Sequence, residues 1–411
     1  MNEKKKLQPK VRFREFTGEN APDWEQRKFR ELLDKEDGIR RGPFGSAIKK
    51  EFFVAESDYV VYEQYNAIYN KFKTRYNINK EKYIELIKFC INPGDFLLSG
   101  AGTIGKIARV PEGIKKGIFN QALVRIKINP STTDSEYFLQ WMRSVNMQKK
   151  LTQMNPGSAM SNLVPMAEVK EWSIYIPSRV EQNYIGKLFE KLDELITLHQ
   201  RKLEQLEQLK NTLLSKMFPK SGTNIPEIRF SGFTDAWKQR KLGEVVNITM
   251  GQSPNSENYT ENPDDNILVQ GNADLKNGRV FPRVWTTQIT KTAEKGDLIL
   301  SVRAPVGSVG KTDYDVVLGR GVAGIKGNEF IFQMLGKMNI DGYWNKYSTG
   351  STFESINSND IIDAQIVLPK EDEQIKLGIF LHQLDEIITI HQRKLEQLKN
   401  LKQTLLNKMF I

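Results

Sequence analysis

The sequence is poor in the residues that hold metals or carry acid–base chemistry. Its 411 residues include one cysteine, Cys90, and three histidines, His199, His382 and His391. A single cysteine excludes an intrachain disulfide and a cysteine-based zinc site. The histidines all lie in stretches with a helical pattern, where a metal or catalytic centre is not expected. We predict that this chain has no catalytic residue and no bound metal.

Long apolar runs are also missing. No segment approaches the roughly 20 apolar residues that span a bilayer, and residues 1–6 (MNEKKK) lack the apolar part of a signal peptide. The hydrophobic content of 39% is that of a soluble globular protein, which we expect in the cytoplasm with no membrane contact. The length exceeds what one hydrophobic core usually supports, so two or more domains are expected.

The net charge of +10 favours a polyanionic partner, and its distribution is uneven. Residues 1–180 hold 31 Lys and Arg against 21 Asp and Glu, whereas residues 219–370 hold 17 against 17. If both halves bind nucleic acid, the second half must use a local basic face and polar base contacts, since it has no net charge to attract the ligand.

The sequence contains an internal repeat. Residues 177–218 align without a gap with residues 369–410 at an offset of 192, and the octapeptide HQRKLEQL at His199 recurs at His391. Residues 9–17 (PKVRFREFT) also match residues 226–234 (PEIRFSGFT). The segments between these anchors differ strongly. A constant frame around divergent inserts is what a protein needs to hold two different ligands in one geometry.

The repeated segments predict two long helices. They are rich in Glu, Gln, Lys and Leu and contain no internal proline, and the 38 residues from Glu181 to Phe218 would span about 57 Å at roughly 1.5 Å per residue. Apolar residues alternate in steps of three and four and predict the following seam: Ile185, Leu188, Leu192, Leu195, Leu206, Leu209 and Leu213 in the first copy, and Leu377, Phe380, Leu384, Ile387, Leu398, Leu401 and Leu405 in the second.

The two seams are expected to bury against each other. A parallel pair in register would bring His199 onto His391 and Lys202 onto Lys394, stacking like charges, so we predict an antiparallel coiled coil. The alternative is that each helix packs on its own domain.

The inserts mix β-rich runs, such as residues 172–176, 297–300 and 365–368, with helical stretches such as residues 136–147. The predicted fold class is therefore α+β, with two mixed α/β domains separated by two long helices in a pseudo-two-fold repeat. The domain boundaries follow: a first domain with an N-terminal extension at 1–178, a central helix at 179–219, a second domain at 220–370 and a C-terminal helix at 371–411.

Three motifs that would indicate an enzyme are incomplete or missing. Residues 100–106 (GAGTIGK) nearly spell a phosphate-binding loop, but Ile107 replaces the required Ser or Thr, and in the second copy Pro305 replaces the first glycine. A turn after a buried strand is the better interpretation. No segment reads as the acidic-Pro-Pro-aromatic loop of an adenine methyltransferase. Neither half repeats an acidic cluster with a lysine, as a duplicated nuclease site would.

Candidate DNA contacts come from residue type, because Arg and Lys read guanine, Asn and Gln read adenine, and Ser, Thr and Lys hold phosphates. An ordinary solvated loop remains the alternative for each of them. The candidates of the first half are Arg40, Arg41, Ser46, Lys49, Lys50, Lys106, Asn120, Gln121 and Ser158. Those of the second half are Gln252, Ser253, Asn255, Ser256, Arg303, Lys311, Arg320, Ser351 and Thr352.

The chain has two unlike inserts framed by near-identical helices, which start at Glu181-Gln182 and Glu373-Gln374 and carry HQRKLEQL. In this arrangement it resembles the specificity subunit of a type I restriction-modification system. The resemblance covers almost the whole chain. It implies two target-recognition domains, each reading half of a split site in double-stranded DNA, and two helices packed antiparallel as a spacer.

The resemblance also implies partners. Two methyltransferase subunits would bring S-adenosylmethionine and methylate adenine N6 after base flipping, and two restriction subunits with ATP and Mg can join them, so no cofactor is expected on this chain. The alternative function is a two-domain protein-interaction scaffold that touches DNA incidentally.

Overall fold

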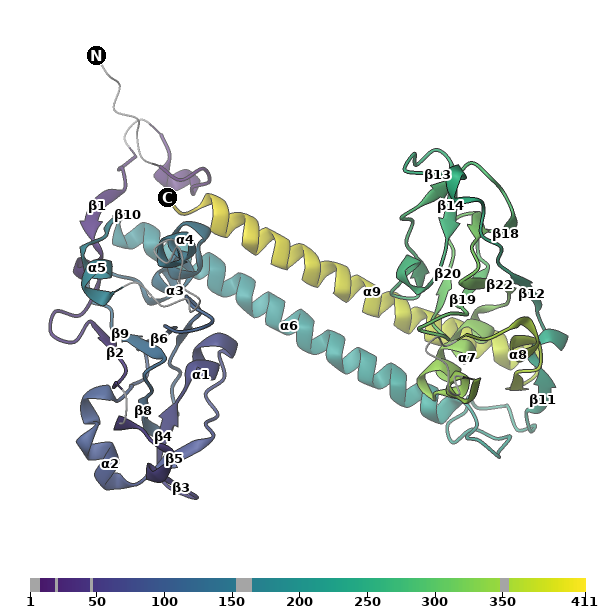
Figure 1. Ribbon diagram of the computed structural model, residues 1–411, viewed down its shortest axis with the longest axis horizontal. Coiled ribbons are helices and arrows are strands. Elements are labelled where there is room, and N and C mark those ends of the chain that lie inside the picture. The colour runs from purple at the N-terminus through teal and green to yellow at the C-terminus, as the bar shows by residue number, and fades with distance from the viewer. Residues whose placement is uncertain (1–7, 19–20, 45–46, 153–164, 348–354) are drawn as a thin grey trace, which may run out of the picture. The chain divides into compact units, whose positions relative to one another are not determined.

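The computed structural model describes residues 8–18, 21–44, 47–152, 165–347 and 355–411. The chain forms two compact units, unit 1 with residues 1–198 and 395–411, and unit 2 with residues 199–394. Each unit contains a mixed α/β domain and a part of each of two long helices (Figure 1), α6 (Arg179–Met217) and α9 (Glu371–Lys408).

The described residues of unit 1 form two four-stranded sheets and a two-stranded ribbon. The first sheet is antiparallel, in the order β2 (Ile39–Arg41), β9 (Leu123–Ile126), β6 (Phe96–Ser99), β7 (Ile107–Arg109). The second has the order β3 (Phe53–Val54), β5 (Tyr76–Ile78), β4 (Tyr59–Tyr62), β8 (Lys116–Phe119), with β4 and β8 parallel. The ribbon pairs β1 (Glu25–Lys28) with β10 (Ser173–Ile176).

The short helices of unit 1 are α1 (Gln64–Tyr69), α2 (Lys80–Glu85), α3 (Ser135–Arg143), α4 (Val145–Thr152) and α5 (Met166–Glu171). The helical stretch predicted at 136–147 is thus two helices, because Ser144 adopts an extended conformation between them. Strand β6 alternates its buried side chains between two cores. Phe96 and Leu98 pack with α3 and α6, and Leu97 packs against the second sheet.

Unit 2 repeats this plan with sheets of more strands. The first has the order β12 (Asn247–Met250), β22 (Val322–Lys326), β19 (Leu298–Ser301), β20 (Val309–Lys311), β16 (Arg279–Val280), β15 (Leu275–Lys276). The second has the order β13 (Tyr259–Thr260), β17 (Trp285–Thr286), β14 (Asn266–Val269), β21 (Val316–Leu318), β18 (Lys291–Ala293). A ribbon pairs β11 (Lys238–Lys241) with β23 (Gln365–Leu368), and the short helices are α7 (Glu329–Ile340) and α8 (Ser358–Ile362).

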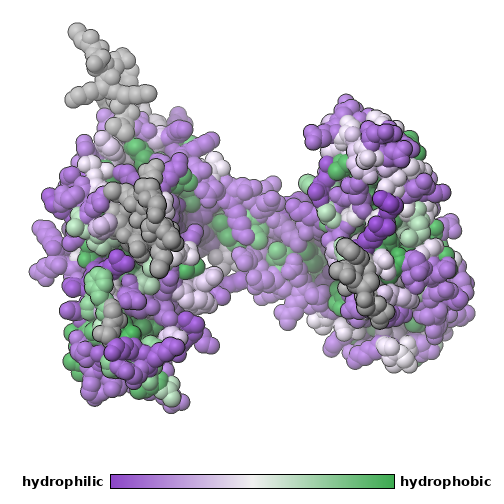
Figure 2. All heavy atoms as spheres, viewed as in Figure 1, coloured by the Kyte–Doolittle hydropathy of each residue, from purple (hydrophilic) through white to green (hydrophobic). Residues whose placement is uncertain are grey.

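The same alternation recurs in unit 2. Leu298 and Leu300 of β19 pack with α7 and the long helices, whereas Ile299 faces the second sheet. Each unit therefore buries one large core between a sheet and the helices and a smaller core between its two sheets. The visible face of each unit is largely hydrophilic (Figure 2). No helix in the described ranges is long and apolar enough to cross a membrane.

The long helices pack antiparallel within each unit. In unit 1, Asp193 of α6 meets Lys402 of α9, and Phe189 stacks on Phe410 at 5.7 Å between ring centroids. In unit 2, Leu206 packs with Leu384 and Ile388, and Lys210 pairs with Asp385 at 2.5 Å. In unit 2, His199 also meets His391, so in both units the α9 partner comes earlier in the chain as the α6 residue comes later. The predicted fold class, including the antiparallel helix pair, is confirmed.

The buried seam differs from the predicted one. Leu209, Phe380, Ile387 and Leu401 are exposed, which corrects the prediction at these four positions. Counting from Ile185, one set of buried and half-buried residues follows steps of four and three, and Leu214 and Leu406 beside it are buried as well. The set consists of Ile185, Phe189, Leu192, Ile196, His199, Leu203, Leu206, Lys210, Leu213 and Met217 in the first copy, and Leu377, Leu381, Leu384, Ile388, His391, Leu395, Leu398, Lys402, Leu405 and Met409, the last just after α9 ends, in the second.

The antiparallel helices do not keep the two histidines apart, which corrects the prediction at this position. His199 and His391 do meet, with 2.9 Å between their Nδ1 atoms, and both are half-buried. A neutral imidazole carries one N–H donor and one bare nitrogen acceptor, so two of them can share a hydrogen bond without repulsion. Lys202 and Lys394 are exposed and lie outside the seam.

Candidate nucleic-acid interface

In unit 1 the sheet edges bring three loops together. The loop after β2 lies against the turn from β8 to β9 (residues 120–122), because Gly42 N donates to Leu123 O at 2.9 Å. The β6–β7 hairpin also contacts this turn, since Gly100 N donates to Ala122 O at 2.7 Å. A Cβ atom on Gly42 would lie 1.9 Å from Asn120 O, so only glycine allows this approach.

Unit 2 builds the same frame from a different sequence. Gly251 N donates to Val322 O at 3.0 Å, and Val302 N donates to Gly321 O at 2.9 Å. A Cβ atom on Gly251 would lie 2.1 Å from Gly319 O. The turn from β21 to β22 (residues 319–321) therefore occupies the place of residues 120–122.

Strand register makes this correspondence residue by residue. Ser99 pairs with Leu123 on β9, and Ser301 pairs with Val322 on β22. The turns also start alike, since Asn120 N donates to Tyr62 O at 3.0 Å and Gly319 N donates to Val269 O at 2.8 Å. It follows that Gln121 and Arg320 occupy the same position, at the tip of the turn.

The remaining candidates of unit 1 lie on β2, on the turn itself and on the segment after Ile48. Arg40 donates to Asp37 at 2.8 Å, and Arg41 lies 5.9 Å from the centre of the Phe44 ring. Asn120 accepts a hydrogen bond from Ala122 N at 3.1 Å and so stabilises its own turn. The other two lysines lie on the loop after Ile48, where Lys49 pairs with Glu51 at 3.6 Å and Lys50 begins a short 3-10 helix.

The position of Arg40 is held from inside the domain. Asp37 also pairs with Arg125, a nearly fully buried side chain with 1% of its surface exposed. Burial alone would raise the pKa of Asp37, but the hydrogen bond from Arg40 and the charge of Arg125 outweigh it and keep that pKa below its usual value. The carboxylate therefore stays ionised and fixes both guanidinium groups.

In unit 2 the candidates from three loops converge. Arg303 and Arg320 line one pocket of about 410 Å³ with Met250 and Ser355. Ser253 Oγ accepts from Arg320 N at 3.0 Å, which ties the loop after β12 to the turn. Other residues of that loop are held by their backbone: Gln252 N donates to Leu318 O at 2.8 Å, Asn255 N donates to Gln288 Oε1 at 2.8 Å, and Ser256 begins a 3-10 helix.

Two lysine candidates do not correspond to each other. Lys106 closes the β6–β7 hairpin, where its N–H donates to Ser99 Oγ at 2.9 Å, so the predicted turn after a buried strand is present. Lys311 lies on β20 and pairs with Glu329 at 3.1 Å. Its counterpart by strand register is Arg109, which pairs with Glu136 at 3.2 Å. This repeated ion pair joins a strand to a helix in each unit. Ser46, Ser158, Ser351 and Thr352 lie outside the described residues.

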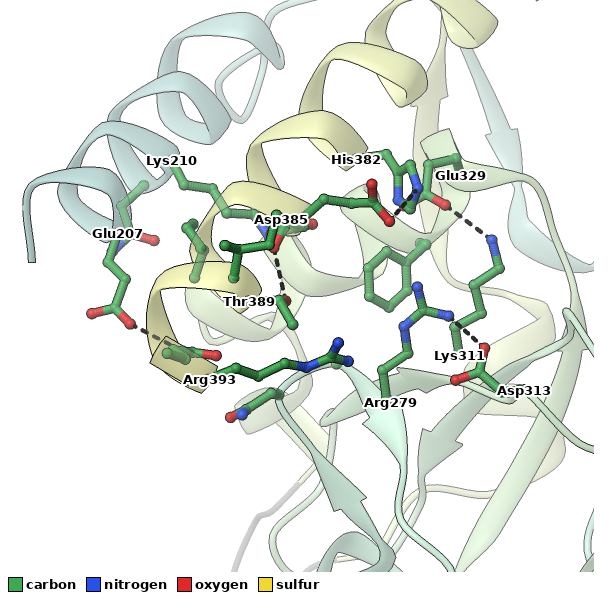
Figure 3. Close-up of a pocket in the computed structure, with 18 residues that line it drawn as sticks. Glu207, Lys210, Arg279, Lys311, Asp313, Glu329, His382, Asp385, Thr389 and Arg393 are labelled. Carbon is green, nitrogen blue, oxygen red and sulfur yellow. Dashed lines mark hydrogen bonds and ion pairs between the residues drawn. The ribbon is translucent and has the colours of Figure 1, made fainter. Parts of the chain in front are cut away.

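A polar cleft of about 710 Å³ lies between the domain of unit 2 and the long helices (Figure 3). Its charges are largely matched: Arg279 donates to Asp313 at 2.8 Å, and Glu329 accepts from Lys311 while lying 3.7 Å from His382. Arg393 points into the cleft toward Arg279 (Figure 3). Among the described residues no cluster of three or more His, Cys, Asp or Glu could hold a metal.

The sequence pattern did not reveal that two carboxylates at the starts of the long helices are buried in ion pairs. Glu181 is fully buried and accepts from Arg12 at 2.7 Å, and Glu373 accepts from Arg229 at 2.6 Å. Each pair ties the repeated PxxRF segment to the start of a long helix. The signal was present, since both the arginines and the glutamates recur in the repeat. Their pairing was hidden because the partners are far apart in sequence.

Comparison with known proteins finds a matching family model and two related proteins. A family model described as type I restriction modification DNA specificity domain matches residues 23–208 and again residues 234–400. A chain described as type I restriction enzyme MjaX specificity subunit, from Methanocaldococcus jannaschii, is 26% identical over 413 residues, covering 95% of this chain and 93% of the relative. The MjaVIII specificity subunit of that organism is 22% identical over 317 residues, covering 71% and 73%.

Solved structures share the fold. The type I restriction-modification S subunit from M. genitalium superposes with a TM-score of 0.68 at 17% identity, covering 98% of this chain and 99% of that one. A chain from a study of complex assembly and conformational transition of the type I system gives 0.55 at 25% identity, covering 94% and 97%.

Proposed function

The chain belongs to the type I restriction-modification DNA specificity family, as a non-catalytic specificity subunit with two target-recognition domains, and from this premise we propose that each domain reads one half of a split DNA target. The observation that carries the proposal is the duplicated loop frame. Gly42 and Gly251 hold the same turn in the two units, while the side chains around it differ. One backbone geometry with two sets of side chains is suited to reading two different half-sites. The reading domains would comprise residues 1–178 and 220–370.

We propose that the helix pair sets the gap between the half-sites. Helices α6 and α9 run unbroken for 39 and 38 residues, and a 38-residue helix spans about 57 Å. One turn of DNA separates half-sites by about 34–36 Å, which a spacer of this length accommodates.

Exposed apolar residues on the helices support two equivalent docking sites for partners. Leu198 and its repeat counterpart Ile390 are 62% and 63% exposed, and Leu209 and Leu401 are each 47% exposed. Isolated exposed leucines are common. Because these residues recur through the repeat, a partner that contacts them on one helix would meet equivalent residues on the other. We propose that two methyltransferase subunits bind there and supply S-adenosylmethionine, and that restriction subunits with ATP and Mg join the same complex in the cytoplasm.

Lengthening the spacer tests the proposal. One heptad that continues the seam is inserted into both α6 and α9, and the modified adenines are mapped genome-wide in cells that also express the methyltransferase subunit. We expect a split target with a changed gap and unchanged half-sites. A seven-residue insertion in the linker at residues 219–225 is the control, and it should leave the gap unaltered. Changed half-sites with a constant gap would contradict the spacer role.

The alternative, a protein scaffold with incidental DNA contact, gives a different binding result. A sequence-specific reader prefers its split site over random duplex at physiological salt, in addition to losing affinity steeply as salt rises. A scaffold would show the salt dependence without the preference. The measurement is a competition titration of the assembled complex on both DNAs at two salt concentrations.

A further inference from the structure

We propose that the tip of the repeated turn is the position that selects a base in each half-site, and that Gln121 selects adenine in one half-site whereas Arg320 selects guanine in the other. The inference rests on the proposed function. It goes further by naming one residue and one base for each domain.

The first support is the equivalence of the two positions. Each turn starts with a backbone hydrogen bond to a neighbouring parallel strand, from Asn120 N to Tyr62 O and from Gly319 N to Val269 O. Each turn also closes in the same way, since Leu123 N donates to Asn120 O at 3.1 Å and Val322 N donates to Gly319 O at 3.2 Å. The two backbones therefore present the residue between them in the same way. What differs is the side chain.

The second support is that both side chains are available. Gln121 and Arg320 are exposed, and neither side chain has a hydrogen-bond or ion-pair partner among the described residues. By contrast, Asn120 uses its carbonyl oxygen on Ala122 N, and Lys311 is paired with Glu329. A group that is already bonded within its own domain would have to give up that partner to read a base.

The third support is the packing under Arg320. Gly319 and Gly321 flank it, and a Cβ atom on Gly321 would lie 2.1 Å from Gln270 O. The turn backbone therefore lies directly on the strand end beneath it, and the arginine is the side chain that projects from it. Arg303 lines the same 410 Å³ pocket and adds positive charge beside it. Unit 2 needs such a local charge because residues 219–370 carry 17 basic and 17 acidic residues.

The assignment of bases follows from hydrogen-bond geometry in the major groove. The guanidinium group of arginine donates two bonds to O6 and N7 of guanine, both of which accept. The amide of glutamine donates to N7 of adenine and accepts from its N6 amino group. Exchanging the side chains should therefore exchange the preferred base. Each such contact discriminates by roughly 5- to 150-fold.

The experiment uses the full chain assembled with its methyltransferase subunits. The split target of the wild-type complex is mapped first, and each base pair of both half-sites is then varied in turn while methylation rates are measured. We expect Arg320→Gln to change the preference at one base pair from guanine to adenine, and Gln121→Arg to do the reverse in the other half-site. Arg320→Lys should keep guanine, because lysine also donates to O6 and N7. Arg283→Gln, at a half-exposed arginine of unit 2 outside the turn, is the matched control and should change neither half-site.

Three results would overturn the inference. The first is a wild-type target in which one half-site lacks adenine or the other lacks guanine. The second is that Arg320→Gln and Gln121→Arg leave both half-sites unchanged while the complex still methylates the split target, in which case the proposed function stands without the inference. The third is that the wild-type complex has no split target at all, in which case the proposed function fails as well.

Discussion

A glycine recurs inside each long helix, Gly186 in α6 and Gly378 in α9, and its replacement tests how the helices are held. A glycine in a helix interior normally destabilises it by about 1 kcal/mol relative to alanine, so Gly→Ala is expected to stabilise an unobstructed helix. At Gly186, however, a Cβ atom would lie 2.7 Å from Asp134 Oδ1 and 3.1 Å from Tyr137 N. The start of α3 is packed directly on the glycine.

The magnitude follows from what the new methyl group displaces. Asp134 caps α3 by accepting from Glu136 N at 3.0 Å and Tyr137 N at 2.9 Å. Losing an N-cap costs about 0.5–2 kcal/mol, and overpacking costs about 1–3 kcal/mol. After the gain of about 1 kcal/mol in helix propensity, Gly186→Ala should destabilise unit 1 by about 1–3 kcal/mol. For a domain of this size that lowers Tm by about 3–10 °C.

Unit 2 provides a matched control. Gly336 lies inside α7, and a Cβ atom there would meet only Val309 Cγ1, at 4.0 Å. Gly336→Ala should therefore raise Tm by about 2–4 °C. Calorimetry of the full chain measures both variants. If Gly186→Ala raised Tm as Gly336→Ala does, the packing of α3 on α6 described above would be refuted.

Further predictions concern the seam and the first domain. His199→Leu alone should lower stability by about 1–3 kcal/mol, because it leaves the His391 imidazole without its partner, whereas the double change to leucine should be neutral or stabilising in thermal melts; equal losses in both would contradict a shared hydrogen bond. Lys402→Ala should cost about 1 kcal/mol, since Asp193 is partly exposed, and exchanging the two charges should recover most of it in a double-mutant cycle; no recovery would show that the ion pair is not the interaction lost. Because the pKa of Asp37 is lowered in the folded chain, its stabilisation is present above the unfolded value of about 3.9 and is lost as pH falls through the folded one. Acid titration of unfolding should therefore show a shallower loss of stability in Asp37→Asn than in the wild type, and parallel curves would contradict the lowered pKa.

The helix pair was largely predictable from the sequence, but its seam was not. The repeat and the periodicity are local signals, and they predicted two long antiparallel helices. Hydrophobicity alone then selected Leu209 and Leu401, which are exposed, and passed over Lys210 and Lys402, which face inward. A lysine can occupy a seam when a carboxylate meets it from the facing helix, as Asp385 does for Lys210. That carboxylate is far away in the sequence, so its effect cannot be predicted from a local pattern.

The candidate interface shows a similar limit. Residue type selected Gln121 and Arg320 among many polar loop residues, but it could not show that they occupy one position. The inserts differ too much in sequence to be aligned at the turn. Their equivalence depends on backbone hydrogen bonds between distant strands, such as Gly42 to Leu123 and Gly251 to Val322. Only the glycines, which permit this close approach, leave a trace in the sequence.

The antiparallel pairing of two copies of one sequence explains which polar residues the seam tolerates. Where a seam residue meets a different position of the other copy, an oppositely charged pair forms, and the duplication produces it twice, as Asp193 with Lys402 and as Asp385 with Lys210. Where a residue meets its own counterpart, charge complementarity is impossible, because both copies carry the same group. That position needs a side chain that both donates and accepts, and histidine at residues 199 and 391 meets this requirement with Nδ1 atoms 2.9 Å apart. Replacing one of the two histidines leaves the other without its hydrogen-bond partner. Replacing both with leucine leaves no imidazole that needs a partner.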